Sequence, residues 1–351
     1  MSNQYYLNRN RNNLRQLNAM LDELPSFCTV YFVGMSTTTT PLTRLSYARD
    51  LKTFFAYLVN YETIFRRKTI KNFEIEDLNK VTNFMIENYI NYLSSYDKED
   101  GSVYSNTETG KKRKLCAIRS FFQFFYERDL LKENVASKVR VPKIHEKAII
   151  RLVGEESKDV LNICENLNGF SEHQRKYNQH FNMRDQAILT LFLGTGIRVS
   201  ELVGLNVEDI DLKSNSFKIV RKGGNQSILY FNDEVKDMLI KYFSFRENLK
   251  LPDDERALFT SIQNKRLGVR SVENLVKKYA KVAVPLKNIT PHKLRSTFGT
   301  NLYHASNDIY LVAEVLGHKD VNTTKKHYAA ISDEIRKNSA NLIKLKDYDD
   351  N

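Results

Sequence analysis

The sequence is poor in the residues that build covalently stabilised or zinc-dependent folds. Its three cysteines, Cys28, Cys116 and Cys164, lie far apart and form no CxxC pair or Cys/His cluster. The sequence therefore indicates neither a disulfide framework nor a zinc site. This cysteine usage favours a reducing compartment.

Long apolar runs are also missing. The longest, around residues 187–193, is far too short to cross a bilayer. The opening residues, MSNQYYLNRNRNN, contain no apolar signal segment. We therefore expect a cytoplasmic protein that has no membrane partner.

Motifs for nucleotide hydrolysis and metal catalysis are absent from the sequence as well. There is no GxxxxGK[ST] loop, no HExxH pair and no carboxylate cluster suited to magnesium. We therefore expect a protein that works without a cofactor and without a metal ion.

Positive charge, by contrast, is abundant. The formal net charge is +12, and the basic residues are dispersed through the chain more than gathered into a tail. This balance favours a polyanionic partner, nucleic acid before membrane, because neutralised phosphates release counterions. The alternative is a soluble protein that is merely rich in lysine, and charge by itself does not separate the two.

The length of 351 residues allows two domains, each with its own core. Residues 1–36 begin polar and rich in asparagine, and we interpret them as an N-terminal extension. Residues 37–140 carry apolar residues at helical spacing and predict a small all-helical domain. Residues 141–150, which include Pro142, are interpreted as a linker. Residues 151–351 form the second domain.

Three apolar stripes define the helices of the first domain. The first helix is predicted to start at Thr40 and Pro41, and the third at about Thr109. The second stripe consists of Phe84, Met85, Tyr89, Ile90 and Leu93. We assign these aromatic residues to the core and not to base stacking.

The third helix carries a basic edge. The residues of this edge are Lys111, Lys112, Arg113, Lys114 and Arg119. Positive charges near a helix N-terminus oppose the macrodipole and need a separate reason, which a phosphate backbone would supply. We interpret the edge as a DNA contact; the alternative is a solvated helix face.

The second domain opens with a helix over residues 181–193 that is broken at the stretch GTG. Arg198 and Glu201 follow, three residues apart, so that the carboxylate can hold the guanidinium in place. The alternating segments SFKIVRK and SILYF, separated by glycines, then predict a hairpin with Lys222 at its turn end.

The stretch from residue 289 to residue 330 concentrates histidine, arginine and tyrosine. Thr290 and Pro291 predict a helix start, which places His292 and Arg295 on one face. A second helix is predicted to begin at Asn307 and Asp308. We expect it to end at Gly317 in the left-handed conformation.

The remaining residues of this stretch follow that second helix. His318 is expected in the turn beyond its end. Thr323 and Thr324 then open a short helical or turn segment that carries Tyr328.

Together these residues suit phosphoryl transfer. Tyr328 is the candidate nucleophile, because a phenol that attacks phosphorus gives a covalent ester. Arg198 and Arg295 can each hold phosphate oxygens, a histidine can donate a further hydrogen bond, and Lys222 can protonate the leaving oxygen. Each residue taken singly has a simpler interpretation as a core, surface or ion-pair residue, so the joint pattern carries the argument.

The segments GTGIRVSEL, KIVRKGGNQSILYF, TPHKLRSTF and VLGHKDVNTTKKHY resemble the tyrosine recombinases of the phage integrase family. The resemblance covers roughly residues 40–330 and is greatest to the simpler, Xer-like members. It implies a mainly helical protein with a small β component. A helical, SAM-like core-binding domain would precede a mixed α/β catalytic domain. The catalytic residues that it implies are Arg198, Lys222, His292, Arg295, His318 and Tyr328, and Glu201 would support them.

The resemblance also implies an activity and an assembly. Such an enzyme cuts and rejoins DNA through a 3′-phosphotyrosyl intermediate without metal or ATP. Four protomers, identical or paired with a paralogue, would meet on a double-stranded recombination site. The C-terminal helix over residues 332–346 would dock on a neighbour; the alternative is that it packs on its own domain. Two alternatives stay open: type IB topoisomerase-like relaxation, and a catalytically silent DNA-binding regulator.

Overall fold

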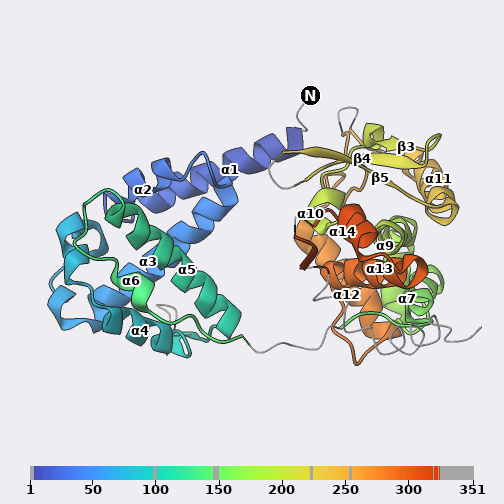
Figure 1. Cartoon of the computed structure of the whole chain (residues 1–351). Coiled ribbons are helices and arrows are strands. Elements are labelled where there is room, and N and C mark those ends of the chain that lie inside the picture. The colour runs from blue at the N-terminus through green and yellow to red at the C-terminus, as the bar shows by residue number, and fades with distance from the viewer. Residues whose placement is uncertain are drawn as a thin grey trace, which may run out of the picture. The chain divides into compact units, whose positions relative to one another are not determined.

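A computed structural model describes residues 4–97, 101–144, 150–221, 224–252, 255–318, 320–322 and 324 (Figure 1). These residues are mainly helical with little strand, so the predicted fold class is confirmed. The chain divides into two compact units, Met1–Lys147 and Ala148–Asn351. The predicted linker, residues 141–150, spans this division, and the other predicted domain bounds stay a prediction.

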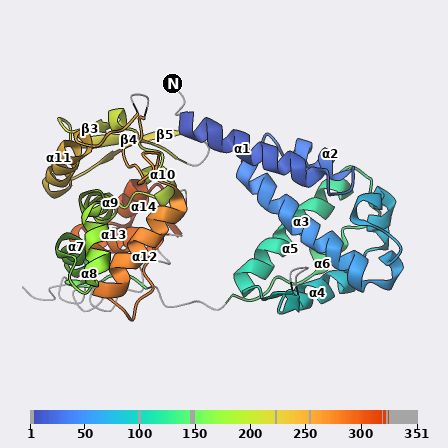
Figure 2. The ribbon, with the colours of Figure 1, turned by 180° about the vertical axis from the view of Figure 1, so that it is seen from behind.

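The first unit consists of helices and a short hairpin. In chain order its elements are α1 (Gln4–Leu21), α2 (Cys28–Gly34), α3 (Pro41–Tyr61), η1 (Thr63–Phe65), η2 (Ile70–Asn72), η3 (Ile75–Lys80), α4 (Asn83–Tyr92), β1 (Tyr96–Asp97), β2 (Val103–Tyr104), α5 (Glu108–Tyr126) and α6 (Val135–Lys138). In both views α1 lies along α3, and the two helices are in contact (Figures 1 and 2).

The segment before α3 is part of the core of this unit. Leu17 of α1 and Cys28 and Tyr31 of α2 are buried in the same cluster as Phe54 of α3 and Phe121 of α5. The polar start of the chain is therefore helical, and its few apolar residues attach it to the body of the unit.

The start of α3 was predicted correctly, whereas one residue of the next stripe was not. Thr40 is the N-cap of α3, and its hydroxyl accepts a hydrogen bond from the Thr43 amide at 3.2 Å. In α4, Ile86 and Tyr89 face the core, but Phe84 is exposed, so the assignment of Phe84 to the core is wrong. Helical spacing from Tyr89 puts Ile86, three positions before it, on the buried face instead.

The second unit combines a helical body with a small sheet. Its elements are α7 (Glu156–Asn166), α8 (Glu172–Gln179), α9 (Asn182–Thr195), α10 (Val199–Leu202), η4 (Val207–Asp209), β3 (Ile210–Asp211), β4 (Ser216–Val220), β5 (Gln226–Tyr230), α11 (Asp233–Glu247), α12 (Val269–Ala283), α13 (Pro291–Ser306) and α14 (Ile309–Leu316). Among the described helices of both units, none has the length and apolarity that a membrane span requires.

The predicted hairpin in this unit is confirmed. Strands β4 and β5 pair antiparallel with Val220 opposite Gln226, and β3 extends the sheet in the order β3-β4-β5. Figure 1 shows the sheet beside α11 at one end of the unit, while α7, α9, α12 and α13 form its helical body. The helices α7 and α8 and the strand β3 were not anticipated from the sequence.

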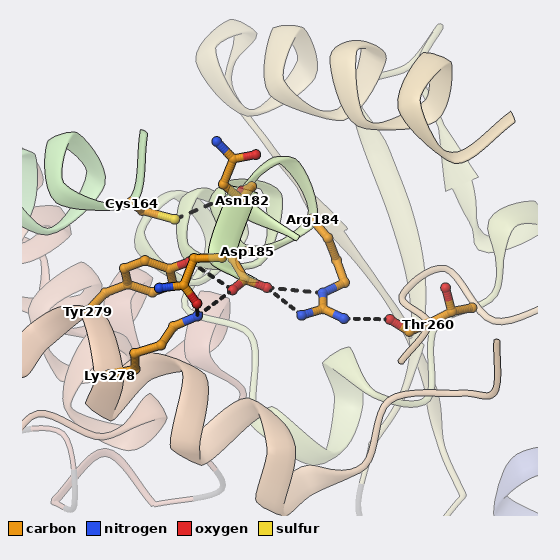
Figure 3. Close-up of polar contacts among 8 residues, drawn as sticks. Cys164, Asn182, Arg184, Asp185, Thr260, Lys278 and Tyr279 are labelled. Atoms are coloured by element: carbon orange, nitrogen blue, oxygen red, sulfur yellow. Dashed lines mark hydrogen bonds and ion pairs between the residues drawn. The ribbon is translucent and has the colours of Figure 1, made fainter. Parts of the chain in front are cut away.

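A buried carboxylate fixes the start of α9 within this body. Asp185 is 1% exposed and accepts hydrogen bonds from Lys278 Nζ at 3.1 Å and from the Tyr279 hydroxyl at 2.9 Å (Figure 3). Arg184 donates to the same carboxylate at 2.7 Å and to the Thr260 carbonyl at 2.8 Å. Burial and the neighbouring carboxylate raise the pKa of Tyr279, so its phenol stays protonated and donates. The network joins α9, α12 and the loop at Thr260.

Replacing this carboxylate should destabilise the second unit strongly. We expect Asp185→Ala to lower the free energy of unfolding by about 3–5 kcal/mol, because it leaves the partly buried Arg184 and Lys278 without their shared counter-charge. Urea unfolding of the full chain, with amide hydrogen exchange of α9 and α12, measures the effect. Asp159→Ala, which removes an exposed carboxylate from α7, is the matched control and should cost less than about 1 kcal/mol. Equal losses for the two variants would contradict this account of Asp185.

Candidate active site

The site is organised around two turns that meet in the second unit, the first of which ends α9. Gly196 follows α9 in the left-handed region, at φ 62°, where a side chain is strained. A Cβ atom at this position would lie 2.5 Å from Phe298 of α13 and 2.9 Å from Leu316 of α14. Glycine is therefore required both by the backbone and by the closeness of α13 and α14.

The second turn ends α14, as the sequence predicted. Asp308 caps the helix start by accepting from the amides of Tyr310 and Leu311. At the other end Gly317 has φ 61°; its amide donates to the Glu314 carbonyl at 2.8 Å, and the His318 amide donates to the Ala313 carbonyl at 2.9 Å. This is a Schellman motif. It leaves the last three carbonyls, those of residues 315–317, outside the helical bonding pattern.

Three arginines from different parts of the chain donate to those three carbonyls. Arg221 donates to Val315 at 3.4 Å, Arg295 donates to Leu316, and Arg198 donates to Gly317 at 3.1 Å. Arg295 also donates to the Gly196 carbonyl at 2.5 Å, which links the two turns. The carbonyl end of a helix carries partial negative charge and attracts cations, so it gathers the three guanidinium groups at one place.

Glu201 holds Arg198 as the sequence suggested. Its carboxylate accepts from the Arg198 side chain at 2.8 Å and from the Arg198 amide at 2.9 Å, and this amide contact caps α10. Glu201 is buried, whereas the Arg198 side chain is 35% exposed. The buried carboxylate thus fixes the guanidinium of Arg198, part of which remains accessible to solvent.

Arg221 is a member of the cluster that the sequence analysis missed. Its guanidinium lies so close to Gly317 that a Cβ at that glycine would overlap it, at 0.9 Å from Nη1. Burial lowers the pKa of Arg221, with a further lowering from Arg198 that the Glu201 carboxylate opposes. Its position at the end of the predicted hairpin strand, directly before Lys222 in the sequence, was the available signal.

The two predicted histidines lie near this cluster. His292 is the second residue of α13 and is exposed, one helical turn before Arg295. His318 follows Gly317 directly, and its Nδ1 lies 2.8 Å from the hydroxyl of Thr324, which is buried. This contact sets the orientation of the imidazole ring of His318.

Two predicted site residues, Lys222 and Tyr328, lie outside the described residues, and so does the predicted C-terminal helix over residues 332–346. Of the predicted catalytic set, the structure brings together Arg198, Arg295 and His318. Arg198 and Arg295 donate to the two residues before His318, and α13 adds His292 nearby.

The predicted basic edge of α5 is largely neutralised within the first unit. Asp50 of α3 is 1% exposed and pairs with Arg113, at 2.8 Å, and with Lys114, which is itself buried. Lys111 pairs with Glu108 at 2.8 Å. The Arg119 side chain donates to the carbonyls of residues 136, 137 and 139. These bonds compensate part of the positive charge of the edge within the protein, and its contact with DNA stays a prediction.

Lys112 differs from the rest of the edge. It is exposed and has no ion-pair partner among the described residues. Among the described residues it makes neither an ion pair nor a hydrogen bond through its side chain, whereas the other four members of the edge do.

Comparison with known proteins places this arrangement in a family. A model of the phage integrase family matches residues 151–334, a range that contains all six predicted catalytic residues and Glu201. The chain belongs to the phage integrase family. The sequence resemblance is therefore confirmed, and with it the class of enzyme.

Relatives within the family are tyrosine recombinases. The tyrosine recombinase XerC of Caldanaerobacter subterraneus is 34% identical over 294 residues, which cover 81% of this chain and 77% of that protein. The tyrosine recombinase XerC of Thermodesulfovibrio yellowstonii is 36% identical over 223 residues, which cover 62% of this chain and 70% of that protein. Similarity to the family thus extends well into the first unit.

Solved structures of the family share the fold. A post-cleavage complex of the XerH site-specific recombinase bound to a palindromic difH substrate superposes with a TM-score of 0.61. The match covers 86% of this chain and 80% of that one, at 20% sequence identity. At this identity the comparison supports the family fold and not individual residue roles.

The turn at Gly196 gives a direct test of how the site is assembled. We expect Gly196→Ala to destabilise the second unit by more than about 2 kcal/mol, because a Cβ is strained at positive φ and collides with Phe298 and Leu316. Gly268→Ala is the control, since a Cβ there meets nothing within 4 Å, and it should cost less than about 1 kcal/mol. Thermal unfolding of both variants provides the comparison. A Gly196→Ala protein as stable as the control would show that α13 and α14 do not close against this turn.

Proposed function

We propose that this protein is a site-specific DNA recombinase that cuts and rejoins DNA through a 3′-phosphotyrosyl intermediate on Tyr328. The observation that carries the proposal is the convergence of Arg198 and Arg295 on the turn that bears His318, in a member of the phage integrase family. Two guanidinium groups fixed at one point suit the binding of a single phosphodiester.

The two arginines would hold the non-bridging oxygens of the scissile phosphate. Each is positioned before DNA arrives, Arg198 by Glu201 and Gly317, and Arg295 by Gly196 and Leu316. Donors fixed in advance need no reorganisation as negative charge builds on the pentavalent phosphorus. Arg221, which contacts α14 from the hairpin side, would act as a positioning residue for this turn.

The covalent step would proceed by in-line displacement. The phenol of Tyr328 loses its proton to solvent and its oxygen forms a bond to phosphorus, while the bond from phosphorus to the 5′ oxygen breaks. Lys222 would donate a proton to that departing oxygen, which leaves as a 5′-hydroxyl. Attack by the 5′-hydroxyl of another strand reverses the step and restores the tyrosine. The ester energy is kept in the phosphotyrosyl bond, so the exchange consumes no ATP.

His292 and His318 would donate hydrogen bonds to the same phosphate. If the Thr324 hydroxyl donates to Nδ1 of His318, Nε2 carries the ring proton and is the donor nitrogen. The exposed His292, one turn from Arg295, would approach the phosphate from the start of α13.

The relatives suggest the roles of the two units and the assembly in which they would act. The first unit would act as the core-binding domain and the second as the catalytic domain, on a double-stranded recombination site in the cytoplasm. Four protomers, identical or paired with a paralogue, would assemble on two such sites, and the segment after Tyr328 would dock on a neighbouring protomer. The two alternatives are relaxation of DNA without site preference and DNA binding by a regulator without catalytic activity. Capture of covalent adducts distinguishes them from recombination.

The nucleophile can be tested without knowing the target. Purified protein is incubated with sheared chromosomal DNA of the source organism. Covalent protein–DNA adducts are captured under denaturing conditions, and their DNA is sequenced. We expect recurrent sites, with the protein on a 3′ end and a 5′-hydroxyl that a kinase labels. Tyr328→Phe should abolish adducts, because the aryl side chain has no oxygen to attack phosphorus.

Tyr310→Phe is the matched control for this experiment. Tyr310 lies on α14 of the same unit and is 71% exposed, and its replacement should leave adduct formation unchanged. Adducts formed by Tyr328→Phe would remove the proposed nucleophile. Adducts at sites without any shared sequence would favour the topoisomerase-like alternative, and their complete absence from the unmodified protein would favour the regulator.

Lys112 is the residue of the basic edge of α5 for which we predict a contact with the DNA backbone. We expect Lys112→Ala to weaken binding to all duplex sequences alike and to reduce the slope of log affinity against log salt by about one unit. Anisotropy titrations with random-sequence duplex at several salt concentrations measure the slope. Lys158→Ala, which removes an exposed lysine of the second unit that is paired with Glu155, serves as the charge control. A Lys112→Ala protein with an unaltered slope would leave the edge as a solvated helix face.

A further inference from the structure

The outer face of α1 presents a row of exposed amide and guanidinium side chains. Gln4, Asn8, Arg11, Asn12 and Arg15 are all exposed and follow one another at helical spacing, so they lie on one side of the helix. The opposite side carries Leu17, which is buried in the core of the first unit. Leu7 and Leu14 lie between the two sides and are partly exposed.

The charge of α1 has one sign. The helix Gln4–Leu21 contains no aspartate or glutamate. In α5, by contrast, Arg113 is paired with the carboxylate of Asp50 of α3. Arg11 and Arg15 have no carboxylate partner among the described residues. A helix face that is polar and carries only positive charge is suited to binding a polyanion.

The side-chain types narrow the partner further. Arginine matches the major-groove edge of guanine, and asparagine or glutamine matches that of adenine, each through two hydrogen bonds. The row from Gln4 to Arg15 is ~16 Å long at the rise of an α-helix, and the major groove, about 12 Å wide, admits a helix. An acidic protein surface would account for the arginines but not for the interleaved amides.

The helix is held ready for such contact by its inner face. Leu17 packs in the core, Met20 and Leu21 contact the same cluster, and α1 lies along α3 (Figure 2). Arg9, on the flank, stacks over the ring of Tyr6 at 5.0 Å. An isolated helix of this length would be marginal in water, so these contacts keep it formed before DNA binds.

We propose that α1 is a DNA-reading element of this protein. Its outer face binds the major groove of double-stranded DNA and reads base edges through Asn8, Arg11, Asn12 and Arg15. The inference rests on the proposed function for its partner, duplex DNA. It assigns a role to a segment outside the residues 151–334 that the family model matches.

Two double variants separate charge from base reading. Arg11→Ala with Arg15→Ala should lower the affinity for selected duplexes at least about tenfold and alter the selected sequence. Asn8→Ala with Asn12→Ala removes no charge and should alter the selected sequence while leaving the salt slope unchanged. Gln4, whose amide donates to Asn8 at 3.4 Å, is left in place. Alanine favours the helix, so a loss of binding would not come from unfolding of α1.

The measurement is selection from a pool of random-sequence duplexes by the full chain, followed by titration of the winners between about 50 and 200 mM salt. Arg66→Ala with Arg67→Ala is the matched control. These adjacent arginines are exposed in the turn after η1, and their loss removes the same charge from the same unit. The control should keep the wild-type selected sequence.

The outcomes decide the inference separately from the proposed function. Unchanged affinity and unchanged selected sequence in both α1 variants would overturn it, and would leave the outer face to a second copy of the chain. Weaker binding with an unchanged selected sequence would also overturn the base-reading role. If the unmodified protein forms no covalent adducts but the α1 variants change the selected sequence, the recombinase mechanism fails and the inference on α1 stands.

Discussion

The candidate site depends on the unpaired carbonyl end of α14. The Schellman turn at Gly317 leaves the carbonyls of Val315, Leu316 and Gly317 without helical donors, and each receives one from an arginine. A buried carbonyl left unpaired costs about 1–3 kcal/mol, so the three guanidinium groups have a structural reason to converge. Repulsion between them is offset by the negative end of the helix and by Glu201.

This arrangement uses the same groups for folding and for the proposed chemistry. A guanidinium has five N–H donors in a rigid plane, and donors that point inward to carbonyls fix the direction of those that remain. Arg295 is 5% exposed and is held at both terminal nitrogens, whereas Arg198 is more open. The more buried arginine gives the site its rigidity, and in the proposed mechanism the more exposed one is the more accessible to a phosphate.

Helix α9 connects this site to the rest of the second unit. Its first turn is held by the buried Asp185, to which α12 contributes Lys278 and Tyr279. Its other end turns at Gly196, whose carbonyl accepts from Arg295. Any shift of α9 within the unit would therefore displace a hydrogen-bonding partner of Arg295.

The first unit shows that a charge pattern has to be interpreted together with the residues that surround it in space. Basic residues at the start of α5 seemed to require a phosphate, because they oppose the helix dipole. Asp50, more than sixty positions earlier in the chain, supplies the counter-charge instead. The arginines on the outer face of α1, within the polar opening segment of the chain, have no such compensation among the described residues.

The sequence by itself determined the features that depend on local chemistry. Thr40 and Pro41, Asp308, Gly317 and the glycine-rich hairpin mark where elements begin and end, since caps and left-handed turns need particular residues nearby in the chain. The spacing of Arg198 and Glu201 likewise predicted their contact, and the resemblance to the family grouped them with Arg295. Only the tertiary structure decided which distant groups pair. It placed Arg221 in the cluster, buried Lys114 against Asp50 and exposed Phe84, because packing between remote segments, and not local propensity, sets these contacts.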